Sequence, residues 1–156
     1  MDRLQKTNAL QERAMKSMPL GVNSNGRFWG KGCTPYFSRG KGSHMWDVDG
    51  NEYIDYRLGF GPVILGYAYD EVDNAVIEAL HSGVTPGITC EREVEVAEAV
   101  INMCPAVEMV RLVNTGSEAT MNAIRVARAY TRREKIIKLE GGYHGGYDYV
   151  LYSTYA

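Results

Sequence analysis

The sequence has no run of about 18 apolar residues, so none of its segments is expected to cross a bilayer. It also lacks a basic excess: 17 Lys and Arg residues stand against 19 Asp and Glu residues, which argues against nucleic acid or an anionic membrane as a partner. The three cysteines, Cys33, Cys90 and Cys104, show no CxxC spacing, so we expect neither a disulfide framework nor a metal site. Its first residues resemble no secretory signal, and these absences predict a reduced, cytoplasmic protein.

Nucleotide-binding loops are missing as well, because neither GxxxxGK[ST] nor GxGxxG occurs. Glycine, in contrast, is abundant, with 17 of 156 residues, or about 11%, compared with ~7% on average. A chain of this length fits one ordinary domain with its own core. The clusters of glycine are therefore the first places to look for loops that bind a ligand.

The first half of the sequence predicts a helix, a connector and a hairpin. Residues 3–18 have the apolar spacing of an amphipathic helix, and residues 20–35 form a connector rich in Gly and Asn. The segments SHMWDV and NEYIDY flank Asp49-Gly50, a strong signal for a β-hairpin. The apolar residues 58–69 predict a loop or a short strand.

Two amphipathic helices follow, over residues 70–80 and 91–104. Acidic residues open the first of them, as suits the positive end of a helix dipole. Its expected buried face consists of Val72, Val76, Ala79 and Leu80. In the second helix the apolar spacing ends at Cys104, which we expect to be a small buried side chain.

The last third predicts a strand, a helix and a strand. Residues 109–114 and 135–139 are short, apolar and β-branched, as buried strands are, and residues 119–130 have helical spacing. Such a unit has two parallel strands and a right-handed crossover. The predicted fold class is therefore α/β, with a small β-rich part before a mostly parallel sheet flanked by helices.

The junction between the first of these strands and the helix has two compatible interpretations. Thr115-x-x-Glu118 matches a capping box, in which the two side chains satisfy free backbone N–H groups. Gly116 and Ser117 also suit an anion, because the start of a helix presents unpaired N–H groups and a positive dipole end.

A second glycine cluster, EGGYHGGY, directly follows the second strand and includes Tyr143 and His144. One interpretation is a flexible loop with an incidental histidine. In open α/β sheets, however, ligands bind beyond the carboxyl ends of the strands, where this loop would meet Gly116 and Ser117. A phosphate site beside a flat aromatic side chain is typical of a site for a planar phosphorylated cofactor.

The segment VNTGSEATMNAIRVARAYTRREKIIKLEGGYHG resembles class III aminotransferases of the fold-type I pyridoxal-phosphate superfamily, and among them the glutamate-1-semialdehyde 2,1-aminomutases. The resemblance continues upstream through PLGVNSNGR, WDVDGNEYIDY, GFGPVILGYA, EREVEVAEAV and PAVEMVRLVN. It implies an N-terminal segment over residues 1–57, followed by an incomplete large domain over residues 58–156 that binds pyridoxal phosphate. It further implies a homodimer that acts on an amino acid or amino-aldehyde substrate.

The resemblance also implies the cofactor-binding residues. Gly116 and Ser117 match the backbone cradle for the cofactor phosphate. Tyr143 matches the aromatic residue that stacks on the pyridine ring, and His144 matches its neighbour in the cofactor pocket.

On the substrate side, Ser24 and Arg27 match residues that meet the substrate, with Arg27 holding its carboxylate. Phe60 matches an aromatic residue over the substrate, at a position where the aminomutases usually have Trp. Tyr67 and Tyr69 stand where histidines are usual. These departures leave open a class III aminotransferase that acts on another amino acid or amine.

The lysine that forms the Schiff base in this family, and the aspartate that pairs with the pyridine nitrogen, belong to later segments of the family. We expect none of the six lysines here to match the Schiff-base lysine. The chain would then hold no catalytic residue and would be an inactive N-terminal portion. An alternative of another class is a non-catalytic remnant that associates with a full-length partner. A third is a truncated product without a stable fold, because half of such a sheet leaves an open edge and an uncovered face.

Overall fold

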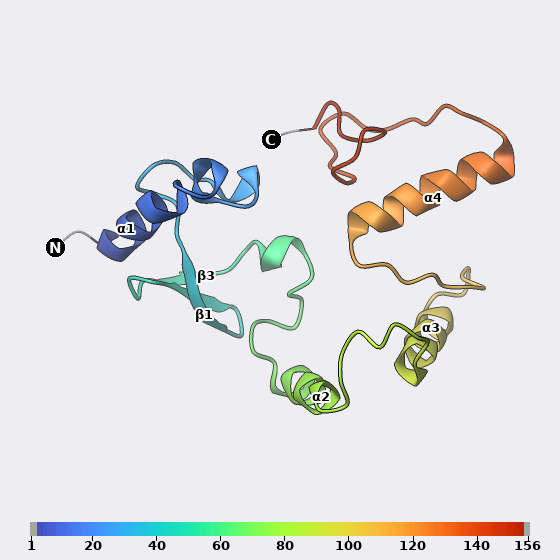
Figure 1. The fold of residues 1–156 in the computed structure, drawn as a ribbon, viewed down its shortest axis with the longest axis horizontal. Coiled ribbons are helices and arrows are strands. Elements are labelled where there is room, and N and C mark those ends of the chain that lie inside the picture. Colours follow the sequence, from blue (N-terminus) through green and yellow to red (C-terminus); the bar gives the residue numbers. More distant parts are fainter. Residues whose placement is uncertain (1–2, 155–156) are drawn as a thin grey trace. The chain divides into compact units, whose positions relative to one another are not determined.

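The computed structural model describes residues 3–154, and the chain forms two compact units, Met1–Val84 (unit 1) and Thr85–Ala156 (unit 2). Unit 1 contains a helix at its start, a three-stranded antiparallel sheet and a second helix (Figure 1). Unit 2 contains two helices and long irregular segments. No helix within residues 3–154 combines the length and the apolar character needed to span a membrane.

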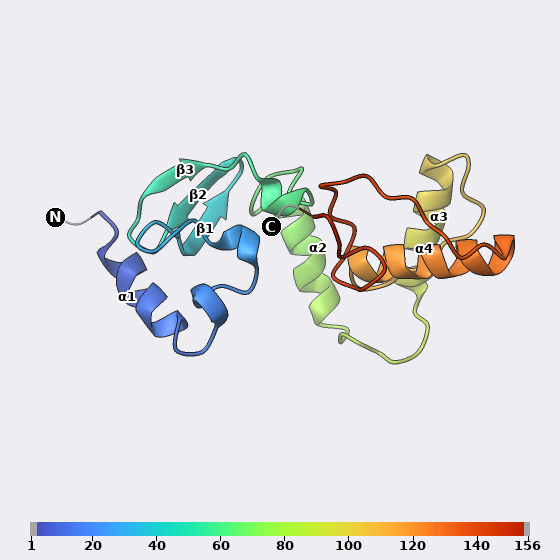
Figure 2. The same ribbon diagram turned by 90° about the horizontal axis from the view of Figure 1, so that it is seen from above.

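The sheet of unit 1 has the strand order β1-β2-β3, and Figure 2 shows the three strands side by side. Its strands are β1 (Phe37–Lys41), β2 (His44–Asp47) and β3 (Glu52–Ile54). The β2–β3 hairpin turns at the predicted Asp49-Gly50, where Gly50 has a φ of +86° that a side chain would strain. The predicted hairpin is confirmed.

Helix α1 (Gln5–Ala14) is held on this hairpin by its first turn. The carboxylate of Asp49 accepts hydrogen bonds from the backbone N–H groups of Lys6 at 2.7 Å and Thr7 at 2.8 Å. This carboxylate thus satisfies two N–H groups that the start of a helix leaves free. The hairpin turn therefore also supplies the cap of α1.

The connector after α1 is fixed in place, although its sequence has no periodicity. It contains the short 3₁₀ turns η1 (Pro19–Gly21) and η2 (Asn25–Arg27). The Tyr36 hydroxyl donates to the Gly21 carbonyl at 2.8 Å, and the Gln11 side chain accepts from the Gly32 N–H at 3.0 Å. These bonds tie the connector to the residue before β1 and to α1.

Helix α2 (Asp70–Leu80) confirms the predicted helix, and Asp70 forms a 2.8 Å ion pair with Lys41 at the end of β1. The prediction of its buried face was wrong. Val72, Val76 and Leu80 are about half exposed. An amphipathic pattern marks the face that a helix can bury, but nothing within residues 3–154 covers this one.

Unit 2 contains α3 (Glu91–Met103) and α4 (Gly116–Thr131), as the sequence predicts. Cys104 is exposed, contrary to the expectation that it is buried. It caps the C-terminal end of α3 and has left the helical conformation, so the spacing of the apolar face no longer applies to it.

The two strands expected on either side of α4 are not formed. Within the described part of the chain, residues 109–114 and 135–139 belong to no strand, and no backbone hydrogen bond joins the two segments. Met109 is 91% exposed and Ile137 is 99% exposed. A strand exists only through the neighbour that pairs with it, and the described residues supply none.

Candidate functional site

The start of α4 has the expected cap. The Glu118 N–H donates to the Thr115 hydroxyl at 3.1 Å, and the Glu118 carboxylate accepts from the Asn114 N–H at 2.7 Å. Within the described residues, the N–H groups of Gly116 and Ser117 have no acceptor. The capped helix therefore still offers two backbone donors at the positive end of its dipole.

The glycine-rich loop of residues 140–147 is bound to the first turn of α4, and Figures 1 and 2 show this C-terminal segment beside that end of the helix. The Gly146 N–H donates to the Ser117 hydroxyl oxygen at 3.2 Å. The Thr120 hydroxyl donates to the His144 carbonyl at 2.7 Å. The two segments singled out in the sequence thus lie together within unit 2.

The contact between the 140–147 loop and α4 requires glycine at position 145. Gly145 is buried and has a φ of +126°. A Cβ atom there would lie 2.8 Å from the Tyr147 ring and 3.0 Å from the Cα atom of Ser117. A side chain would therefore both strain the backbone and push the loop off the helix.

Tyr143 and His144 leave their side chains accessible on this loop. The Tyr143 side chain is 66% exposed, and His144 is exposed as well. An accessible aromatic ring close to two free amide donors and a serine hydroxyl fits a planar ligand that carries a phosphate group. These residues accordingly fit pyridoxal phosphate.

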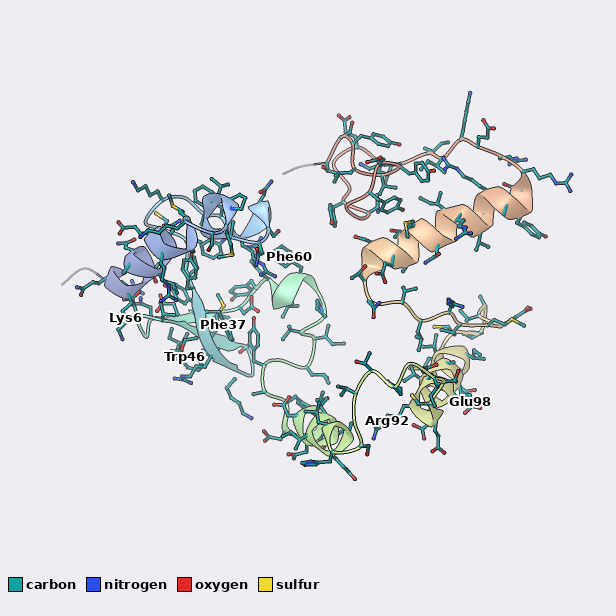
Figure 3. All side chains as sticks on the ribbon, viewed as in Figure 1. Lys6, Phe37, Trp46, Phe60, Arg92 and Glu98 are labelled. Atoms are coloured by element: carbon teal, nitrogen blue, oxygen red, sulfur yellow. The ribbon has the colours of Figure 1, made fainter. Side chains whose placement is uncertain are left out.

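Unit 1 has a cavity of about 500 Å³ between the connector and the sheet. Arg27 and Phe60 line it, whereas Ser24, the residue before η2, is exposed and does not. Figure 3 labels three of its aromatic side chains, Phe37 and Trp46 on the sheet and Phe60 in the 3₁₀ turn η3 (Leu58–Phe60) that follows it. The structure thus brings two of the three predicted substrate-side residues to one cavity.

Two carboxylates that line this cavity are occupied by hydrogen bonds. Asp55 accepts from the Tyr67 hydroxyl at 2.7 Å, and Asp47 accepts from the Tyr53 hydroxyl at 2.8 Å. Burial raises the pKa of each aspartate, but these bonds and further backbone and side-chain donors outweigh it and lower the pKa below 3.8. Burial and the neighbouring carboxylate raise the pKa of both tyrosines. Both aspartates therefore stabilise the unit as anions and are not poised to act as bases.

Arg57 is a cavity-lining residue that the sequence interpretation missed. Its Nη1 donates to the Gly26 carbonyl at 2.8 Å, and its guanidinium carbon lies 4.5 Å from the centre of the Phe60 ring. A single charge directly before the apolar residues 58–69 was the signal available in the sequence.

Similar proteins give a consistent result. A model of the class-III aminotransferase family matches residues 30–155. The glutamate-1-semialdehyde 2,1-aminomutases of Sulfurihydrogenibium azorense and Persephonella marina are 51% identical over 151 residues and 49% identical over 154 residues. These matches cover 96% and 97% of this chain but 35% and 36% of the relatives. The chain thus spans about a third of the length of the curated relatives it matches.

Two solved structures are similar over nearly the whole chain. An omega-transaminase from Sphaerobacter thermophilus has a TM-score of 0.86 and 38% identity, and the match covers 93% of this chain and 33% of the transaminase chain. A transaminase with pyridoxal phosphate bound has a TM-score of 0.87 and 40% identity, and the match covers 94% of this chain and 34% of the transaminase chain. This similarity confirms the α/β fold class expected from the sequence.

Proposed function

The chain belongs to the class-III aminotransferase family, and we propose that it provides part of a pyridoxal-phosphate-dependent enzyme that acts as a glutamate-1-semialdehyde 2,1-aminomutase. The observation that carries this proposal is identity of about 50% with proteins of that name over nearly all of this chain. The sequence resemblance to fold-type I enzymes and the accessible ring beside the start of α4 support it.

In this proposal unit 2 holds the cofactor. The free N–H groups of Gly116 and Ser117, with the Ser117 hydroxyl, bind the phosphate, and the helix dipole favours its negative charge. Tyr143 covers the pyridine ring, and His144 flanks it. When bound, the cofactor withdraws electrons from the amine-bearing carbon of the substrate.

Unit 1 holds the substrate in the same proposal. Arg27 binds the substrate carboxylate, because a planar guanidinium donates two parallel hydrogen bonds to it. Phe60 packs over the rest of the substrate, and Ser24 contributes a hydroxyl group. The substrate is a small amino acid or amino-aldehyde that carries a carboxylate, and its amino group moves to the neighbouring carbon.

The test of this function is an assay of the complete enzyme to which this chain contributes, with pyridoxal phosphate and glutamate-1-semialdehyde. Shifting the amino group by one carbon yields 5-amino-4-oxopentanoate, which can be quantified. Tyr143→Ala is expected to weaken cofactor retention about tenfold through lost stacking, whereas Tyr130→Ala, which removes another exposed aromatic side chain of unit 2, leaves it unchanged. Equal retention in the two variants would refute the stacking role.

A second candidate function is a class III aminotransferase that acts on another amino acid or amine. The 38–40% identity with solved transaminases and the presence of Phe60 where Trp is usual favour it. The two activities differ in stoichiometry, because an aminomutase needs no second substrate and an aminotransferase needs a keto-acid acceptor. Turnover that depends on added keto acid would favour the aminotransferase.

We also propose a homodimer in the cytoplasm, a boundary near residue 57 between the N-terminal segment and the large domain, and no cofactor attachment to the six lysines of this chain. The family resemblance supports the dimer, the boundary and the assignment of the lysines, and the three free cysteines support the cytoplasmic location. Light scattering on the purified protein tests the dimer. Borohydride reduction with pyridoxal phosphate, followed by peptide mass analysis, tests the lysines: specific modification of one of these six would contradict the proposal.

A further inference from the structure

One guanidinium group joins the two segments on which the proposed substrate-side residues lie. The Nη1 atom of Arg57 donates to the carbonyl of Gly26, the residue before Arg27, at 2.8 Å. Its guanidinium carbon lies 4.5 Å from the centre of the Phe60 ring and 5.9 Å from that of Trp29. These contacts combine a charge-assisted hydrogen bond with cation–π attraction. Together they hold the Arg57 guanidinium, the Gly26 carbonyl and the Phe60 ring in one arrangement.

The backbone of Arg57 is itself held on both sides. Its N–H donates to the Asp55 carboxylate at 2.7 Å, and its carbonyl accepts from the Phe60 N–H at 2.9 Å. Asp55 is buried and is fixed in turn by the Tyr67 hydroxyl at 2.7 Å. The guanidinium therefore extends from a rigid base.

Gly26 fits closely into this arrangement. A Cβ atom there would lie 3.7 Å from the Phe60 ring and 3.8 Å from Nη2 of Arg57, which is ordinary contact distance. The η2 turn that carries Arg27 thus packs directly on the pair formed by Arg57 and Phe60. Arg27, Arg57 and Phe60 all line the same cavity.

We propose that Arg57 is a positioning residue for substrate binding: it fixes the η2 turn, and with it Arg27, against the Phe60 ring. The inference rests on the proposed function, because it takes Arg27 as the group that binds the substrate carboxylate. Arg27 binds a carboxylate that does not react, so its misplacement weakens binding of the substrate and of the transition state alike. Loss of Arg57 therefore raises KM and leaves kcat nearly unchanged.

Arg39 provides the matched control. Its guanidinium carbon lies 3.5 Å from the centre of the Trp46 ring, so it is also an arginine stacked on an aromatic side chain of unit 1. It contacts neither η2 nor Phe60 among the described residues and does not line the cavity. Arg57→Met and Arg39→Met each keep an unbranched apolar stem and remove the charged group.

The test compares both variants with the unaltered complete enzyme that contains this chain, in the aminomutase assay and in binding of 5-amino-4-oxopentanoate followed by tryptophan emission. For Arg57→Met we expect KM and Kd to rise about tenfold, with kcat within about twofold, which corresponds to one lost hydrogen bond to a charged group. Arg39→Met is expected to change none of them. In the double variant Arg27→Ala/Arg57→Met, KM equals that of Arg27→Ala alone, because Arg57 acts through Arg27.

Unchanged KM and Kd in Arg57→Met, an equal effect of Arg39→Met, or additive effects in the double variant would overturn the positioning role alone. No turnover and no binding in the unaltered complete enzyme would refute the proposed function and the positioning role together. If Arg57→Met fails to fold, Arg57→Lys replaces it, because an ammonium group cannot both reach Gly26 and stack on Phe60. KM is then expected to rise about threefold, and no change would overturn the proposal.

Discussion

The two units differ in what their residues have available to bury. Unit 1 buries polar side chains, and two of them, Asp47 and Asp55, accept several hydrogen bonds from nearby residues. Among residues 85–154 of unit 2 the buried residues are Val150 and Gly145, and Met109 and Ile137 are almost fully exposed. Unit 1 thus satisfies these two carboxylates internally, whereas the apolar segments of unit 2 have no cover within residues 3–154.

This difference separates two ways in which a sequence determines structure. Hairpins, caps and hydrogen-bonded carboxylates involve residues close in sequence or in one small network, so they form wherever those residues are present. Buried strands and apolar helix faces depend on distant partners. Trp29 and Trp46, the two tryptophans of the chain, both lie in unit 1, so tryptophan emission reports on unit 1 alone.

The largest effect is expected from Asp47→Ala, in which unit 1 should unfold at a lower denaturant concentration. Its carboxylate accepts from the Asn51 backbone at 2.8 Å, the Asn51 side chain at 2.8 Å and the Tyr53 hydroxyl at 2.8 Å. Its loss leaves partly buried donors without this acceptor and costs about 3 kcal/mol in the free energy of unfolding. Chemical denaturation, monitored through tryptophan emission, measures this change in the free energy of unfolding. Asp148→Ala, an exposed position in unit 2, should leave the midpoint unchanged.

Next in size, Gly145→Ala should disturb unit 2 without affecting tryptophan emission. The added Cβ would meet Ser117 and Tyr147, so the loop would leave α4 and the affinity for pyridoxal phosphate should fall more than about tenfold. Gly87→Ala is the control, because Gly87 also has positive φ, +68°, but nothing lies within 4 Å of its Cβ position. Titration with the cofactor compares the two variants, and equal affinities would show that the close approach is unimportant.

A smaller effect is expected from Thr115→Ala, which removes the cap of α4 and costs about 1 kcal/mol. Thr131→Ala is the control within the same helix, because its hydroxyl lies at the other end, where it donates to the Ala127 carbonyl and accepts a 3.3 Å bond from the Arg133 N–H, and it caps no N–H group of the first turn. Circular dichroism during thermal unfolding should show a lower midpoint for Thr115→Ala only. Identical midpoints would mean that the cap does not limit the stability of this helix.

The smallest effect is a pH dependence confined to unit 1. Hydrogen bonds outweigh burial and lower the pKa of Asp47 and Asp55 below 3.8, so their contribution to stability is complete above that value. It is lost as the pH falls through the lower pKa of the folded state. The denaturation midpoint from tryptophan emission should therefore decrease below about pH 4. The double variant Asp47→Asn/Asp55→Asn should show a flatter profile, and an equally steep one would exclude these two groups.

The contrast between contacts formed by nearby residues and contacts that need distant partners explains which parts of the structure the sequence predicted. The hairpin at Asp49-Gly50 and the helix starts at Asp70 and Thr115 follow from local signals. The proximity of Ser117 to the 140–147 loop was predicted as well, although the strands from which it was inferred are not formed within the described residues. The cofactor and substrate roles of these residues stay predictions.

The errors concern partners that a local pattern does not specify. The apolar face of α2, the exposed Cys104 and the unpaired residues 109–114 and 135–139 all required a neighbour for their predicted state. Arg57 was missed for a related reason, since its contact with Gly26 spans 31 positions of the chain. A charge in an apolar segment indicates that a partner exists but does not identify it.

The double use of Asp49 has a consequence for the order in which unit 1 assembles. Its carboxylate closes the first turn of α1 across 42 and 43 positions of sequence, but it can do so only after the β2–β3 turn has placed it. Helix nucleation is the costly step for a segment of ten residues, so α1 should gain its structure late, after the hairpin. Protection of the Lys6 and Thr7 amides from hydrogen exchange would therefore record the moment at which the hairpin is complete.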